Sequence, residues 1–383
     1  MIKSSYVGFL IFAGMMIIFF VLPDPEGLQK PFRVLLGVSF IVIYFALLIK
    51  KEIAPITLWP VIIGGFFVVL MIFRGTILSS FINAYLCLFG LLCIPKLFFS
   101  LTPIRQVNLN YLHILCIISI IIQFFAYSSD DGRPKLAYEI NLSGAYLFLF
   151  FISSDILKNK HGKLIVVVLS LITLSRLLVF SIIIYYLVRY SKKYFRSWLH
   201  KISATVIIIT GYVLISIFSL WYVVNIKSEI NYDKSINRIA NLNDGSNQLR
   251  FLANTLVMAT IYTTPFDIKV LFGYGPDVNY IAATKGSMIG PHNELYDSII
   301  QYGIITVIFF SLFSLPVFNK VTSYANIEYL IPILFYTLIL WIRFLLVPSF
   351  EMLFILFMLN IVNEKNKLSE PGLFANEHRL PCT

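Results

Sequence analysis

Residues 158–196 read KNKHGKLIVVVLSLITLSRLLVFSIIIYYLVRYSKKYFR. Within them, the apolar run 163–190 lies between two basic flanks. A spanning helix needs roughly 20 residues, so this run is too long for one untilted span, and Thr173, Ser175 and Arg176 interrupt it at its middle. Lysine and arginine beside a span favour the cytoplasmic side, and both flanks carry several. The run is therefore predicted to enter the membrane and return, as two short helices with Ser175 and Arg176 near the turn.

The rest of the chain is similarly apolar. Of its 383 residues, 58% are hydrophobic and 13% are charged, about half the roughly 25% of an ordinary soluble domain, and the mean hydropathy is +0.84. That is too little charged surface to cover a water-soluble globule of this size. A cytosolic enzyme and a disordered chain are therefore excluded, and nucleic acid is not the expected partner for the net charge of +11.

Ten further apolar runs bring the expected number of helical segments to about twelve. The chain is thus predicted to be an all-α polytopic membrane protein, with 1–383 forming one membrane domain and both termini cytoplasmic. The orientation follows from the cations, because the segments assigned to the cytoplasm hold 17 of the 30 lysines and arginines. The ten runs are 5–22, 32–49, 54–73, 76–94, 110–127, 141–157, 202–224, 294–315, 325–346 and 347–363.

One long periplasmic loop is expected over 225–291, and a cytoplasmic tail over 364–383. In the loop, apolar residues recur at helical spacing after a polar start at 243–247, which predicts an amphipathic helix. That helix either lies on the membrane surface or packs over its own bundle, and the second interpretation is favoured. The apolar positions are Leu249, Leu252, Leu256 and Val257.

Three arginines are expected on the outer face. Arg176 is the most informative, because a guanidinium within the membrane costs at least about 2.5–3.5 kcal/mol on insertion scales and usually faces a cavity, a partner or a substrate. Its alternatives are a salt bridge to another helix and snorkelling to the interface. Arg133 and Arg250 are weaker candidates, because a loop arginine is usually a solvated surface charge.

His292 follows Pro291, which suits the first position of a helix. The imidazole then lies in the first helical turn, where unpaired N–H groups attract phosphate and disfavour imidazolium. A neutral imidazole there can accept a proton near pH 7, as a general base must, although a helix-capping cluster is an equal alternative. Arginine forks match phosphate geometry, so three arginines and a histidine on one face suggest a lipid-linked diphosphate. No metal-binding motif is present.

These residues carry a resemblance to a known family. The chain resembles the bacterial O-antigen polymerase family, within the O-antigen ligase and polymerase superfamily. It departs from the family's usual pattern at Glu139-Ile140-Asn141, where Asn-Pro-Asn is common, and at Leu177, where a small residue is common. The features that match are Arg133 with Asn141 ahead of a span, Thr-x-Ser-Arg at 173–176, the long outer loop, Gly273-x-Gly275, and Pro291-His292-Asn293-Glu294-Leu295 with Gly303 downstream.

The resemblance implies a metal-independent glycosyltransferase that uses undecaprenyl-diphosphate-linked glycans as donor and acceptor on the periplasmic side of the bacterial inner membrane. Two alternatives stay open: an O-antigen ligase, whose acceptor is lipid A–core, and a flippase for the same lipid. Whether a separate chain-length regulator protein binds is also open. The implied catalytic residues are His292, Asn293 and Glu294, and the implied diphosphate-binding or substrate-binding residues are Arg133, Arg176, Arg250, Ser175 and Asn141.

Overall fold

The protein is an α-helical membrane protein. The computed structural model describes residues 4–22, 29–75, 79–128, 134–136, 140–173, 175–194, 203–225, 245–275, 293–323, 326–339 and 343–369. Over these residues it has helices and no strand apart from one isolated bridge between Ser128 and Pro134, which confirms the all-α prediction. Six helical stretches of the described chain are long and apolar enough to cross a membrane. The expected total of about twelve segments stays a prediction.

The described chain has nine other helices besides the six long stretches. The long stretches are α2 (Gln29–Ile49), η1 with α3 (Pro55–Phe73), α4 (Ser79–Leu97), α5 (Pro103–Ala126), α10 (Ala204–Asn225) and α15 (Ile304–Val321). The other helices are α1 (Ser4–Phe20), α6 (Ile140–Ile156), α7 (Lys160–Thr173), α8 (Arg176–Ser191), α11 (Gly245–Thr263), α12 (Ile268–Phe272), α14 (Glu294–Tyr302), α16 (Ile327–Ile339) and α17 (Phe350–Ser369).

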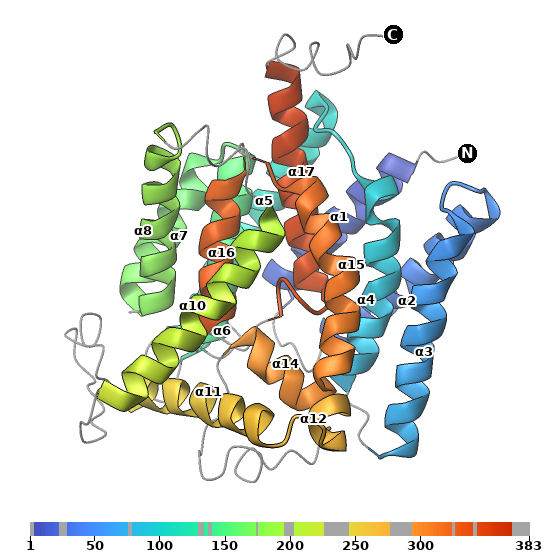
Figure 1. Cartoon of the computed structure of the whole chain (residues 1–383). Coiled ribbons are helices and arrows are strands. Elements are labelled where there is room, and N and C mark those ends of the chain that lie inside the picture. The colour runs from blue at the N-terminus through green and yellow to red at the C-terminus, as the bar shows by residue number, and fades with distance from the viewer. Residues whose placement is uncertain are drawn as a thin grey trace, which may run out of the picture.

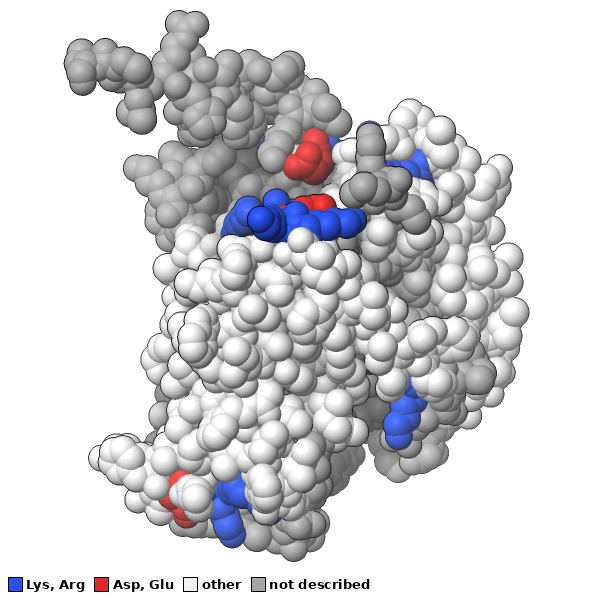
Figure 2. Space-filling view, turned by 90° about the vertical axis from the view of Figure 1, so that its right-hand side faces the viewer, with Lys and Arg blue, Asp and Glu red and all other residues white. Residues whose placement is uncertain are grey.

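The two ends of the bundle are named below by what they carry, and the end where Lys163 and Arg189 bind Asp155 is called the charged end. At the charged end, α1 begins and α17 ends (Figure 1), and side-chain contacts there join Arg105 to Ser5 and Lys365 to the carbonyl of Ile156. The opposite end, called the α11 end below, carries α11, α12 and α14. Figure 2 shows a broad uncharged region between charged groups at two levels of the face it presents. This is the distribution expected of a bundle whose middle faces lipid.

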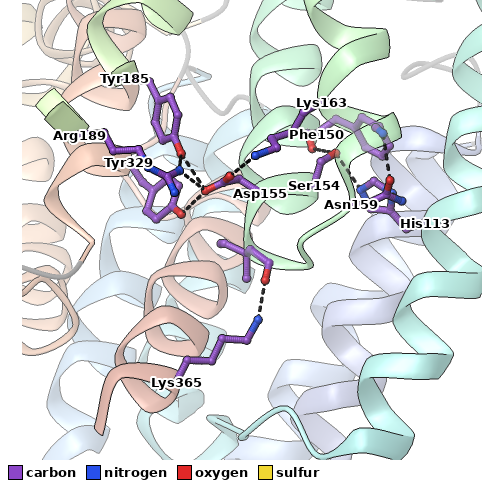
Figure 3. A network of polar contacts seen from close by, with 12 residues as sticks. His113, Phe150, Ser154, Asp155, Asn159, Lys163, Tyr185, Arg189, Tyr329 and Lys365 are labelled. Atoms are coloured by element: carbon purple, nitrogen blue, oxygen red, sulfur yellow. Dashed lines mark hydrogen bonds and ion pairs between the residues drawn. The ribbon is translucent and has the colours of Figure 1, made fainter. Parts of the chain in front are cut away.

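The run 163–190 forms the predicted hairpin, because both of its ends bind one carboxylate at the charged end (Figure 3). Lys163 Nζ of α7 lies 2.6 Å from Asp155 Oδ1, and Arg189 Nη1 of α8 lies 3.0 Å from Asp155 Oδ2. A continuous helix would separate these two cations by about 39 Å. Tyr185 and Tyr329 also donate to Asp155 Oδ2, at 2.7 and 2.6 Å, so the carboxylate joins α6, α7, α8 and α16.

Replacing Asp155 with alanine is expected to destabilise the protein by about 2 kcal/mol. Removing one partner of a buried ion pair costs about 3–5 kcal/mol, but the Lys163 and Arg189 side chains are 26% and 42% exposed and regain contact with water. The thermal midpoint of the detergent-solubilised protein measures the loss. Glu52→Ala, at the same end, is the control, and an equal midpoint in both variants would contradict the joining role of Asp155.

The prediction of a single span over 294–315 is wrong, because Gly303 separates α14 from α15. Gly303 has φ +85°, and a Cβ there would lie 2.2 Å from the carbonyl oxygen of Leu271. Gly273 has φ +84° and faces the same contact, where a Cβ would lie 2.3 Å from the Gln301 carbonyl oxygen. The Tyr274 amide donates to the Ile300 carbonyl at 2.8 Å. The backbone of residues 271–274 therefore packs directly against the backbone of residues 300–303, where α14 ends and α15 begins.

Gly303→Ala is expected to destabilise the protein by more than about 1–3 kcal/mol, which is the cost of holding a residue with a Cβ in a backbone region, here φ +85° and ψ 157°, that is essentially limited to glycine. The clash with the Leu271 carbonyl adds to this cost. Gly14→Ala in α1 is the matched control, since its Cβ meets nothing within 4 Å. Thermal midpoints measured in one detergent should fall for Gly303→Ala and stay unchanged or rise for Gly14→Ala.

The predicted division between spans 325–346 and 347–363 is also wrong. Helix α16 ends at Ile339, α17 begins at Phe350, and the described residues 343–349 between them are not helical. Helix α17 continues to Ser369, into the predicted tail 364–383. The non-helical backbone of 343–349, called the α16–α17 connection below, needs hydrogen-bond partners from elsewhere in the protein.

Candidate functional site

Glu294 supplies partners for the α16–α17 connection. Its side chain is fully buried, and its Oε1 accepts hydrogen bonds from the amides of Leu346 at 2.6 Å, Leu345 at 3.1 Å and Val347 at 3.3 Å. Its Oε2 accepts from the Tyr212 hydroxyl at 2.9 Å. The carboxylate thus takes the place of the backbone acceptors that a continuous helix would provide.

Asn293 fixes the start of α14 from the other side. Its Oδ1 accepts from the amides of Leu295 at 2.9 Å and Tyr296 at 3.4 Å, as a helix N-cap does. Its Nδ2 donates to the carbonyl of Leu338 at 3.3 Å, in the last turn of α16. Asn293 therefore binds the end of α16, and Glu294 binds the α16–α17 connection that follows it.

Arg343 holds the same connection onto α14. Its Nη2 lies 3.2 Å from Asp297 Oδ2 and also donates to Gln301. Its guanidinium carbon lies 4.6 Å from the centre of the Tyr302 ring, which is close enough for a cation–π interaction. Within the connection, the Ser349 hydroxyl donates to the Arg343 carbonyl at 2.5 Å. Side chains thus replace helical hydrogen bonds along much of this segment.

The tip of the α7–α8 hairpin reaches the end of α16 as well. Ser175 is the N-cap of α8 and Arg176 is its first residue. Ser175 packs so closely on Gly144 of α6 that a Cβ on the glycine would lie 2.7 Å from the serine oxygen. The Tyr336 hydroxyl of α16 donates to the Gly144 carbonyl at 3.1 Å. The starts of α6, α8 and α14 therefore meet around the last turns of α16.

Helix α11 covers α14 in the position where the sequence predicts a helix. Val257 is buried against Tyr296 and Ile300 of α14, and the Phe251 ring lies 4.6 Å from that of Tyr222 in α10. The helix therefore packs over its own bundle, across the α11 end (Figure 1). Arg250, in its first turns, is buried with 9% of its surface exposed.

The structure brings together part of the predicted site. Ser175, Arg176, Asn293 and Glu294 come from helix starts that meet at α16, and Arg250 lies on the helix that covers α14. Asn141 is in the first turn of α6, where its backbone is described, while its side chain, like Arg133 and His292, lies outside the described residues. Sequence analysis did not identify Tyr212, which lies in an ordinary apolar span. The sequence suggests Glu351 as the partner of Arg343, because both lie near the outer ends of consecutive apolar runs. The structure instead places Arg343 Nη2 3.2 Å from Asp297 Oδ2, and Glu351 Oε1 3.0 Å from Arg33 Nη1.

Chemically, the arrangement offers one buried cation, Arg250, two partly buried ones, Arg176 and Arg343, and fixed backbone at one end of an apolar bundle, where preorganised donors are strongest. Across the described part of the chain, no group of three or more His, Cys, Asp and Glu side chains is arranged to hold a metal ion. No protein-family model matches the chain, and neither does any curated protein or solved structure.

Proposed function

We propose that this protein is an O-antigen polymerase, a glycosyltransferase that joins undecaprenyl-diphosphate-linked repeat units into polysaccharide in the bacterial inner membrane. The observation that carries the proposal is that Arg250 is buried on α11, a helix that lies at the end of the bundle opposite the charged end (Figure 1). The positive-inside rule assigns the charged end to the cytoplasm. The α11 end then faces the periplasm, where the lipid-linked units are joined.

In the proposed reaction, a hydroxyl of the incoming unit attacks the anomeric carbon of the growing chain. The bond from that carbon to the diphosphate oxygen breaks, and undecaprenyl diphosphate leaves with the electron pair. His292 takes the proton of the attacking hydroxyl as general base. A diphosphate leaving group needs charge stabilisation more than protonation, and Arg176, Arg250 and Arg133 supply it by binding the diphosphate oxygens.

Asn293 and Glu294 have a supporting part in this proposal. They follow His292 directly in the chain and fix the start of α14 to the α16–α17 connection through the hydrogen bonds described above. A general base must lie within hydrogen-bond reach of the proton it takes. Holding the helix start in one place therefore orients His292, without either side chain touching the substrate.

Arg176→Ala is expected to leave single, unpolymerised units on lipid A in a cell that otherwise makes long O-antigen chains. Arg176→Lys should restore polymerisation only in part, because lysine binds phosphate as a point charge and lacks the arginine fork. Lys269→Ala is the control, since it removes an exposed cation of α12 at the same end. The readout is the ladder of lipopolysaccharide lengths on a gel.

A normal ladder from correctly inserted Arg176→Ala protein would contradict the proposal. The same gel separates polymerase from ligase. Deleting a polymerase leaves one unit attached to lipid A, whereas deleting a ligase leaves none.

A further inference from the structure

The corner between α11 and α12 exposes large apolar side chains. Residues 262–269 are all exposed. Among them, Tyr262 is 87% exposed, Phe266 88% and Ile268 60%. Single exposed apolar residues are ordinary on any protein, but several gathered in one place mark a contact with a membrane or a partner.

This corner adjoins the apolar side of a spanning helix. Arg74, which follows α3, donates to the carbonyls of Phe272 and Gly273, each at 3.2 Å. These bonds hold the end of α12 beside the end of α3. The outer side of α3 is apolar and exposed along its length, and it ends in Phe73, which is 85% exposed. In a spanning helix such a side faces lipid, so the corner lies where the lipid-facing surface of α3 reaches the α11 end.

We propose that Tyr262, Phe266 and Ile268 insert into the lipid interface of the membrane leaflet at the α11 end. Tyrosine is favoured at the level of the headgroups, and phenylalanine and isoleucine insert at the boundary with the acyl chains. The two charged residues of the corner, Asp267 and Lys269, are also compatible with a position at the level of the headgroups. Asp267 caps α12 by accepting from the Lys269 amide at 2.7 Å, and a lysine side chain extends to the headgroups from a buried stem.

The insertion fixes α11 at both of its ends. Its first turns pack on α10 through Phe251, and its last turn at Tyr262 is held by lipid, about 18 Å from Arg250 along the helix axis. Helix α11 is therefore both a cover for the bundle and an interfacial anchor. If the proposed function holds, the anchor also sets the depth of Arg250 relative to the diphosphate of the lipid substrate, and this one consequence rests on that function.

A spin label at Phe266→Cys tests the insertion. The background is Cys382→Ser, because Cys87, Cys93 and Cys116 are buried and should not take up the label. The labelled full chain is placed in vesicles of phosphatidylethanolamine and phosphatidylglycerol. Collisions of the label with oxygen, which concentrates in lipid, are compared with collisions with a water-soluble nickel chelate. Ile268→Cys provides a second label on the same corner.

Two positions calibrate the measurement. Leu312→Cys lies on the exposed side of α15 and represents lipid, and Lys50→Cys lies in the exposed turn at the charged end and represents water. We expect an oxygen-to-nickel collision ratio at Phe266→Cys and Ile268→Cys that is several-fold above that of Lys50→Cys and close to that of Leu312→Cys. A ratio equal to that of Lys50→Cys would overturn the insertion. So would low collision with both reagents, which would mean that protein covers the corner, such as a second copy of the chain. No substrate is used, so a failure of the proposed function leaves this result unaffected.

Discussion

Glu294→Ala is expected to destabilise the folded protein by more than about 3 kcal/mol, because each buried group left without a hydrogen-bond partner costs about 1–3 kcal/mol. The substitution removes the acceptor of three backbone amides and of the Tyr212 hydroxyl at once. The backbone amides of Leu345, Leu346 and Val347 then have no hydrogen-bond acceptor on α14. The loss is measured as the thermal midpoint of the detergent-solubilised protein.

Glu294→Gln is expected to recover most of that stability. The amide oxygen can accept from the Leu346 amide, and the NH2 group can donate to the Tyr212 hydroxyl, which has free lone pairs. Tyr212→Phe removes the hydroxyl that contacts both Glu294 Oε2 at 2.9 Å and Thr337 Oγ1 at 3.1 Å, and should cost about 1–2 kcal/mol at roughly 1 kcal/mol for each hydrogen bond. The three variants therefore form a series in which stability follows the number of hydrogen bonds kept by the groups around position 294.

The same variants distinguish two roles of Glu294, namely positioning the start of α14 and taking part in the reaction. A glutamine cannot exchange a proton, so Glu294→Gln should still extend glycans if Glu294 only positions the start of α14. Folded Glu294→Gln protein that is as inactive as His292→Ala would contradict this role and would place the carboxylate in the reaction itself.

His292→Ala is expected to slow glycan extension by about 10²–10⁴-fold, which is the usual contribution of general acid–base catalysis. The attacking hydroxyl then loses the group that takes its proton, while the arginines that bind the diphosphate are unchanged. The concentration dependence on the lipid-linked donor should therefore stay close to that of the wild type as the maximal rate falls. The measurement is single-turnover extension by purified protein.

His161→Ala is the matched control for His292→Ala. His161 is an exposed histidine in the first turn of α7, at the charged end, and its removal should leave the extension rate unchanged. A rate for folded His292→Ala within a few-fold of that of His161→Ala would remove His292 from the role of base.

The hairpin was predictable because its signals are local. The basic residues on both flanks of 163–190 and the polar interruption at its middle are all within one stretch of sequence. Asp155, which joins the two ends, comes shortly before the first basic flank in the chain, and one cation of each flank lies within ion-pair distance of it. The helical spacing of α11 is also a local signal, and a helix lies where it predicts one.

The two interrupted spans were not predictable because their causes are distant in the chain. The run 294–315 is apolar after its first turn, and the need for a break at Gly303 comes from the backbone of Leu271. Helix α16 ends at Ile339, where the sequence stays apolar and without proline up to Arg343, so no local signal marks the end itself. Its geometry depends on Glu294, which accepts hydrogen bonds from amides about 50 residues later in the chain. Tyr212 was missed for the same reason, because only its contact with Glu294 distinguishes it from other tyrosines in spans.

The most direct test of the proposed function is extension of purified lipid-linked repeat units by purified wild-type protein in vesicles, with a metal chelator present. We expect lipid-linked glycans of increasing length and one undecaprenyl diphosphate released for each new linkage, with no requirement for a metal ion and with both products lost in Arg176→Ala. Folded wild-type protein that moves the lipid-linked unit across the bilayer but forms no new glycosidic bond would contradict it.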